Sequence, residues 1–181
     1  AELADELIDN DLRRVEGRIE RHLVLVGHPA DDGTEVRIPP YGRNILVAGP
    51  SGCGKSTLTA GLVERLTEQA YQVLIVDPEG DYSTLQSVVS LGNQHRPPDA
   101  HEILSILEDP TINLSINLLG LPVEDRPFFL GQLVPDLQAL RARTGRPHWI
   151  VLDEAHHMLP QRWGHVTSTF PAGLGEIILV T

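Results

Sequence analysis

Short apolar runs alternate with amphipathic stretches from Asn44 to the end of the chain. Five runs are typical of strands buried on both faces: NILVAG (44–49), YQVLIVD (71–77), TINLSINL (111–118), HWIVLD (148–153) and GEIILVT (175–181). Apolar residues at helical spacing occupy three intervals between them: about 55–70, 101–109 and about 123–143. Strands that alternate with helices predict an α/β fold, a three-layer α/β/α sandwich around a mostly parallel sheet.

The first 40 residues have a different pattern. Residues 2 to about 16 have helical spacing, with acids early and arginines late, which predicts an amphipathic helix. HLVLVG and TEVRIP flank the turn-rich HPADDG, which predicts a β-hairpin over 22–39. We therefore expect an N-terminal helix or linker over 1–21, the tail of an upstream domain in one interpretation, and a main domain over 22–181.

Polar and Gly/Pro-rich stretches predict loops over 90–100 and 158–173. The last predicted strand runs into Thr181, which indicates a piece of a larger protein whose main domain is incomplete at its C-terminus.

Composition narrows the classes of function. With 181 residues, 41% of them hydrophobic, the chain suits one domain with a packed core. A formal charge of −11 repels nucleic-acid backbones at long range. The single Cys excludes an intramolecular disulfide and is consistent with a reducing, cytoplasmic location. Since no apolar run approaches the roughly 18 residues that span a bilayer, we expect no membrane insertion of this segment.

The strongest motif follows the first strand of the main domain. It fits the pattern G-x-x-x-x-G-K-[ST] of a phosphate-binding loop with Gly49, Pro50, Ser51, Gly52, Cys53, Gly54, Lys55, Ser56 and Thr57. Small residues let backbone N–H groups point at a phosphate, and the helix that follows adds its positive dipole end.

Individual residues of this loop have separate expected roles. Lys55, the only Lys of the chain, would reach the β- and γ-phosphates, and Ser56 would bind Mg²⁺. Cys53 fills a variable position as a small residue. A plain Gly-rich turn would not require Lys-Ser at this offset.

A second motif ends the strand HWIVLD. Because parallel strands end at the ligand edge of an open α/β sheet, Asp153 and Glu154 should emerge beside the phosphate loop. There Asp153 would hold Mg²⁺ and Glu154 would orient and deprotonate the attacking water, although acids at a strand end can also be simply solvated.

Three further groups of residues carry weaker signals. Asp77 and Glu79 follow another strand. They could help to position Mg²⁺ or water from outside its direct ligands, or they could simply belong to a solvated turn, and the sequence favours neither. His156 and His157 are expected to form a loop pair that contacts the next strand, with γ-phosphate sensing by His156 as the alternative. Three arginines form a basic cluster that suits a helix end, an arginine finger or a nucleic-acid contact: Arg141, Arg143 and Arg146.

Three segments in this order, GRNILVAGPSGCGKST, VDPEGDY and IVLDEAHHMLP, resemble the P-loop ATPase core of the HerA/FtsK superfamily. The resemblance covers about residues 22–181 and implies ATP and Mg²⁺ as cofactors, Mg²⁺ binding at Asp153 and hydrolysis assisted by Glu154. Family members that move DNA are rings with a sensor residue after the next strand and an arginine from a neighbouring subunit. The acidic charge and the end at Thr181 leave translocation, a DNA partner and a homo-oligomer open.

Other families with a similar loop fit less well. ABC transporter ATPases need an L-S-G-G-Q signature that residues 111–147 lack, DEAH helicases need further motifs, and guanylate-type kinases lack the D-E strand end. ELADELIDNDL resembles the closing helix of haloacid dehalogenase-type phosphatases, although an ordinary amphipathic helix explains it as well. Three functions therefore remain. The chain is an ATPase, a DNA-translocating motor subunit, or a non-catalytic nucleotide-sensing module fused to another enzyme, for example a haloacid dehalogenase-type phosphatase.

Overall fold

A computed structural model describes residues 23–30, 33–159 and 176–181, and the chain divides into two compact units, 1–40 and 41–181. In the first unit, strand β1 (Val24–Gly27) pairs antiparallel with β2 (Val36–Ile38), with a bulge between Leu25 and Gly27. This confirms the predicted hairpin. The predicted helix over 2–16 and the expected boundary at residue 21 lie outside the described residues.

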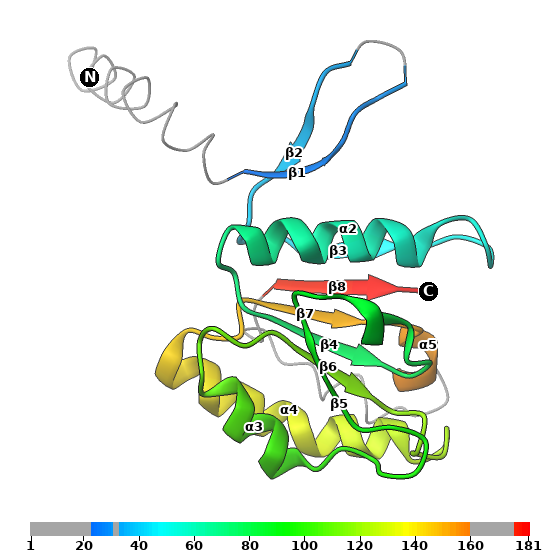
Figure 1. The fold of residues 1–181 in the computed structure, drawn as a ribbon, viewed down its shortest axis with the longest axis vertical. Helices are drawn as coiled ribbons and strands as arrows, with labels where there is room; N and C mark the ends of the chain where they lie inside the picture. Colours follow the sequence, from blue (N-terminus) through cyan, green and yellow to red (C-terminus); the bar gives the residue numbers. More distant parts are fainter. Residues whose placement is uncertain (1–22, 31–32, 160–175) are drawn as a thin grey trace, which may run out of the picture. The chain divides into compact units, whose positions relative to one another are not determined.

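The second unit is built on a parallel sheet whose strands follow the order β3-β8-β7-β4-β6-β5. In Figure 1 the arrows of these strands run side by side in one direction. The strands are β3 (Ile45–Val47), β4 (Val73–Asp77), β5 (Val89–Leu91), β6 (Leu114–Asn117), β7 (Trp149–Leu152) and β8 (Glu176–Val180). All five predicted strands of the main domain are present, and the predicted α/β class is confirmed.

Helices connect these strands, and the three longer ones lie at the predicted places, whereas the two short ones were not predicted. They are α2 (Lys55–Glu68), the 3-10 helix η2 (Asp81–Thr84), α3 (Ala100–Leu107), α4 (Arg126–Thr144) and the short α5 (Ala155–Met158). The side chain of Asp99 caps α3 by accepting hydrogen bonds from the N–H groups of His101 and Glu102. None of the helices in the described ranges is at once long enough and apolar enough to cross a membrane.

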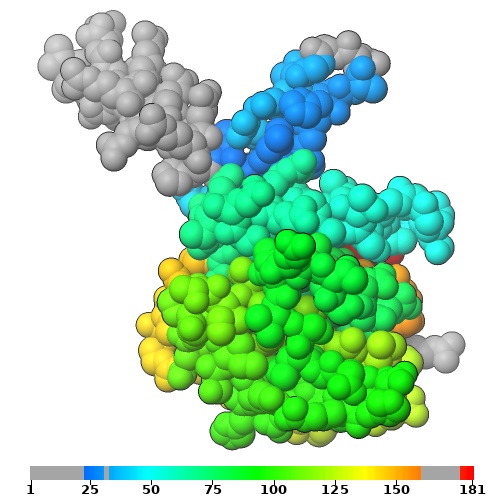
Figure 2. Space-filling view, viewed as in Figure 1, coloured from blue at the N-terminus to red at the C-terminus, as the bar shows by residue number. Residues whose placement is uncertain are grey.

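The register of the sheet divides its side chains between two layers of helices. Leu74 lies level with Leu114 and Ile150 on neighbouring strands, and all three belong to one core with α3 and α4. The alternate residues face the other way, where α2 contributes a separate buried set: Leu62, Val63 and Leu66. In the space-filling view only a small part of the red β8 shows between its neighbours, as expected for an interior strand (Figure 2).

Strand β5 corrects the sequence prediction, which assigned residues 90–100 to a loop. Val89, Ser90 and Leu91 pair in parallel with β6 at the edge of the sheet. An edge strand has one neighbour and an open side, and Val89 is half exposed. The segment therefore lacks the apolar run that marks the inner strands, and its three residues give no period to detect.

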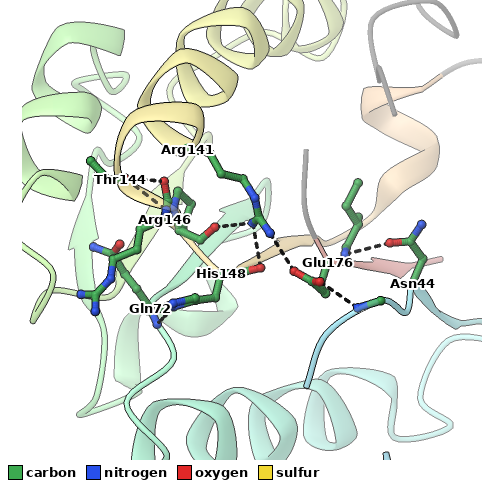
Figure 3. Close-up of polar contacts among 10 residues, drawn as sticks. Asn44, Gln72, Arg141, Thr144, Arg146, His148 and Glu176 are labelled. Carbon is green, nitrogen blue, oxygen red and sulfur yellow. Dashed lines mark hydrogen bonds and ion pairs between the residues drawn. The ribbon is translucent and has the colours of Figure 1, made fainter. Parts of the chain in front are cut away.

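A polar network lies where the strands begin (Figure 3). Arg141, near the end of α4, donates to Glu176 Oε2 at 2.8 Å and to the carbonyls of Pro147 and His148. The second oxygen of Glu176 accepts the N–H of Gly42 at 2.9 Å. These bonds tie the end of α4 to the residues just before β7, to the first residue of β8 and to the segment that leads into β3.

Candidate functional site

The predicted phosphate loop connects the end of β3 to the first turn of α2. Its backbone requires glycine at two positions, because Gly52 and Gly54 have φ angles of 78° and 95°, in the left-handed region. No side chain caps the first N–H groups of α2, and Gly54 stands at the cap position. Free N–H groups at the positive end of a helix dipole are the feature by which such loops bind anions.

Lys55 lies over this loop. Its Nζ donates to the carbonyl oxygens of Gly49 at 2.9 Å and Pro50 at 3.3 Å, so the ammonium group is held on the inner side of the turn. A Cβ on Gly49 would come within 2.7 Å of Cys53 Sγ, which shows how closely the two ends of the loop approach. Cys53 packs there as the small residue expected, with an exposed side chain.

Asp153 follows β7 at the same end of the sheet as the loop. Only one strand, β8, separates β7 from β3, and the Gly49 N–H donates to the carbonyl of Thr181 just beyond β8. Asp153 is 3% exposed and accepts the N–H of Glu154 at 2.9 Å. Burial raises the pKa of Asp153, although the Glu154 N–H and the Tyr82 side chain oppose the rise.

Glu154 adopts left-handed backbone angles, φ 44° and ψ 49°, at the start of α5. Such a conformation costs a residue with a side chain of order 1 kcal/mol or more, and it turns the chain sharply after the strand. Its carboxylate is partly exposed, and Oε2 lies 3.2 Å from His156 Nδ1. Both expected acids therefore stand at the strand end, one buried and one open to solvent.

The first turns of α2 approach Asp153. Thr59 is buried, and the side chains of Thr59 and Asp153 both interact with Tyr82. Ser56 lies three residues before Thr59 and so on the same face of the helix.

The donor set suits Mg²⁺. A hydroxyl and a carboxylate are hard oxygen ligands, and Mg²⁺ normally keeps several waters and binds few protein groups besides phosphates. Within the described ranges, three or more His, Cys, Asp or Glu residues nowhere surround a common metal position. Among the residues that the structure describes, no Arg or Lys pairs with the buried Asp153 carboxylate, which fits a site completed by a cation.

Asp77 ends β4, next to β7, and is fully buried. Its carboxylate accepts the N–H groups of Gly80, Asp81 and Tyr82 at 2.7–3.1 Å, and thereby caps η2. Burial raises its pKa, against the lowering effect of these backbone bonds. Asp77 thus lies beside Asp153 but is engaged by its own turn, whereas Glu79 is exposed and interacts with Arg126.

Tyr82 is the residue of this region that sequence reasoning missed. Its hydroxyl is buried, and burial with the neighbouring Asp153 raises its pKa far above the usual value. Its only sequence signal is its position at the end of VDPEGDY, a motif whose carboxylates are the more obvious candidates.

The weaker candidates separate into two groups. His156 belongs to α5 instead of the predicted loop, but it does contact the segment after the next strand, since Nδ1 lies 3.4 Å from Thr181 Oγ1. The three arginines of the basic cluster lie at the opposite end of the sheet from the phosphate loop, because they precede β7. Arg143 pairs with Glu108, and Arg146 donates to the carbonyl of Pro110.

Comparisons with known proteins show the family of the chain. The family model DUF87, "Helicase HerA, central domain", matches residues 24–145, which include the phosphate loop and VDPEGDY. Among solved structures, the chain is similar to the conjugation coupling protein TcpA of pCW3, in its monomer form with ATPγS, at 16% identity and a TM-score of 0.43. That similarity covers 88% of this chain and 48% of TcpA, so the chain spans about half the length of that protein. No protein of curated function matches the chain in sequence. Since the family model covers more than half of its residues, the chain belongs to the family of the helicase HerA central domain.

Proposed function

We propose that the chain binds ATP with Mg²⁺ at the phosphate loop and hydrolyses it. The observation that carries the proposal is the common location of two unlike features. A loop that presents uncapped N–H groups at the start of α2 stands at the same end of the sheet as Asp153 and Glu154. Phosphate binding explains the loop, and metal binding with water activation explains the acids. Membership in the HerA central-domain family supports ATP as the nucleotide.

In this proposal the residues of the loop, Gly49 to Thr57, surround the phosphates with N–H groups. Lys55 exchanges its bonds to the loop carbonyls for phosphate oxygens and offsets the charge that develops during transfer. Mg²⁺, held by Ser56 and through water by Asp153, would neutralise further phosphate charge when bound. Glu154 accepts a proton from the attacking water, and its partly exposed carboxylate leaves room for that water.

Asp77 belongs to the outer layer of the same site in this proposal, since it is adjacent to Asp153 but engaged by its own turn. For Glu79 a role near Mg²⁺ stays a prediction, and its interaction with Arg126 favours the alternative of a solvated turn.

The basic cluster offers no support for the DNA-motor alternative. Arg141, Arg143 and Arg146 all have partners within the chain. The nucleotide-sensing alternative requires the same loop but no turnover, so an activity measurement separates it from the ATPase.

The test compares two glutamate variants of the 181-residue chain. Glu154→Gln removes the proposed base, and Glu64→Gln changes an exposed acid on α2 as a matched control. We expect Glu154→Gln to retain ATP affinity within about twofold and to lose at least 100-fold in kcat, while Glu64→Gln behaves as wild type. Binding is measured by calorimetry with ATPγS and Mg²⁺, and turnover by phosphate release.

Each outcome selects one function. Unchanged turnover in Glu154→Gln removes Glu154 from the mechanism. Tight binding without turnover in the wild-type chain favours the nucleotide-sensing module. Turnover that rises severalfold with added double-stranded DNA favours the motor.

A further inference from the structure

Tyr82 holds a buried hydroxyl at the end of the sheet that bears the proposed site. The side chain is 2% exposed, and its hydroxyl makes no hydrogen bond of ordinary geometry within the described part of the chain. Burying a hydroxyl without a partner costs a few kcal/mol, so an unpaired one at a proposed site indicates a use there.

The turn that carries Tyr82 is tightly built. Three backbone N–H groups, including that of Tyr82 itself, converge on the Asp77 carboxylate. Gly80 has a φ of 81°, and a Cβ there would approach Asn117 Nδ2 to 2.8 Å, so the turn packs closely against the residues that end β6.

The hydroxyl lies near the strand end that bears Asp153. Asp77 and Asp153 end adjacent strands, and the N–H of Asp153 donates to the carbonyl of Val76 at 3.1 Å. The hydroxyl interacts with the side chains of Asp153 and, across from it, Thr59 of α2. Tyr82 therefore lies between the β7 end and the helix that carries Ser56.

We propose that Tyr82 is the positioning residue of the metal site: once the metal site is filled, its hydroxyl donates to the Asp153 carboxylate and orients it toward Ser56 and the phosphate loop. The inference rests on the proposed function, because it assigns Asp153 to Mg²⁺. Only one backbone N–H, that of Glu154, otherwise holds the carboxylate within the described residues. A second donor fixes the plane of the carboxylate, and Asp77 acts on the metal through Tyr82 by capping η2.

The test uses Mn²⁺ in place of Mg²⁺, because electron paramagnetic resonance measures its binding directly. Tyr82→Phe retains the ring and removes the hydroxyl. Tyr71→Phe is the matched control, since Tyr71 precedes β4 at the opposite end of the sheet and contacts His148 by its ring edge. With saturating ATPγS, we expect Tyr82→Phe to weaken Mn²⁺ binding about 10-fold or more, as loss of an outer-shell partner does. Binding of ATPγS in EDTA should stay within twofold of wild type, and Tyr71→Phe should match wild type in both.

The remaining outcomes contradict the proposal in distinguishable ways. If Tyr82→Phe binds Mn²⁺ as wild type does, the positioning role is wrong and the proposed function stands. If it loses ATPγS binding equally with and without metal, Tyr82 supports the loop and not the metal site. If the wild-type chain binds neither ATPγS nor Mn²⁺ with it, the proposed function fails, and the role of Tyr82 fails with it.

Discussion

The two ends of the parallel sheet treat buried charge in opposite ways. Where the strands begin, the carboxylate of Glu176 pairs with Arg141 and also accepts the Gly42 N–H, with both side chains mostly buried. Where they finish, Asp153 is buried more deeply, and the described residues give it one backbone N–H and no cationic partner. Burial raises the pKa of Asp153, which shows that its charged form is disfavoured there.

This difference distinguishes an end of the sheet that holds elements together from the end at which we propose the nucleotide site. A buried charge with a partner holds elements together, whereas a buried charge without one costs free energy that folding alone does not recover. A bound cation beside the Asp153 carboxylate would offset the free energy that its burial costs. The two ends of one sheet can thus be distinguished by whether their buried charged groups already have a partner within the chain.

The largest expected effect on stability lies at the starting end. Arg141→Met leaves Glu176 without its cation and removes the bonds to the Pro147 and His148 carbonyls, so we expect a loss of about 2–4 kcal/mol in the free energy of unfolding. Arg143→Met breaks an exposed pair with Glu108 and should cost less than about 1 kcal/mol. Urea unfolding measures both, and equal losses in the two variants would contradict the structural role assigned to Arg141.

Two glycines, one at each end of the sheet, allow a comparison in which the expected loss of stability is intermediate. Gly54 in the phosphate loop and Gly145 after α4 both have positive φ, and a Cβ would meet no atom within 4 Å at either position. Each change to Ala should therefore cost about 1 kcal/mol of stability from the backbone alone. Only Gly54→Ala should also reduce ATP affinity, by at least 10-fold in calorimetry. Equal affinities in the two variants would show that the loop conformation does not matter for binding.

The smallest effect is a pH dependence at the starting end. Burial, then the charges of Arg146 and Arg141, lower the pKa of His148, and its Nδ1 accepts the N–H of Gln72. The unfolded chain therefore binds a proton first as the pH falls below about 6.5, so stability decreases toward the folded pKa and levels off beneath it.

Because His148 is partly exposed, we expect this decrease to stay under about 1 kcal/mol. Urea unfolding between pH 7.5 and 5 measures it. His148→Asn should lose the dependence, while His101→Asn, at an exposed position of α3, should retain it. A dependence that survives in His148→Asn would place its origin elsewhere.

Local sequence signals predicted the inner part of the fold. Strands β4, β7 and β8 are mostly apolar runs because both of their faces are covered, and such runs are visible without tertiary information. The phosphate loop, with Asp153 and Glu154, was equally accessible, since short motifs fix their spacing and parallel strands bring their ends together.

The rest depends on contacts between distant residues. Arg141 and Glu176 are 35 positions apart, and neither carries a local signal of its partner. Tyr82 meets Asp153 only because β4 and β7 are neighbours, an order that the sequence does not state. Strand β5 escaped detection because an edge strand of three residues shows no period.

The most direct test of nucleotide binding uses the one lysine of the chain. A sample labelled with ¹³C at lysine Cε gives a single side-chain signal, which belongs to Lys55. We predict that this signal shifts and saturates when ATP and Mg²⁺ are added, because Nζ leaves the carbonyls of Gly49 and Pro50 for phosphate oxygens. Adenosine, which has no phosphate, should leave it unchanged. A lysine signal that stays in place at millimolar ATP would contradict the central claim that this loop binds a nucleotide.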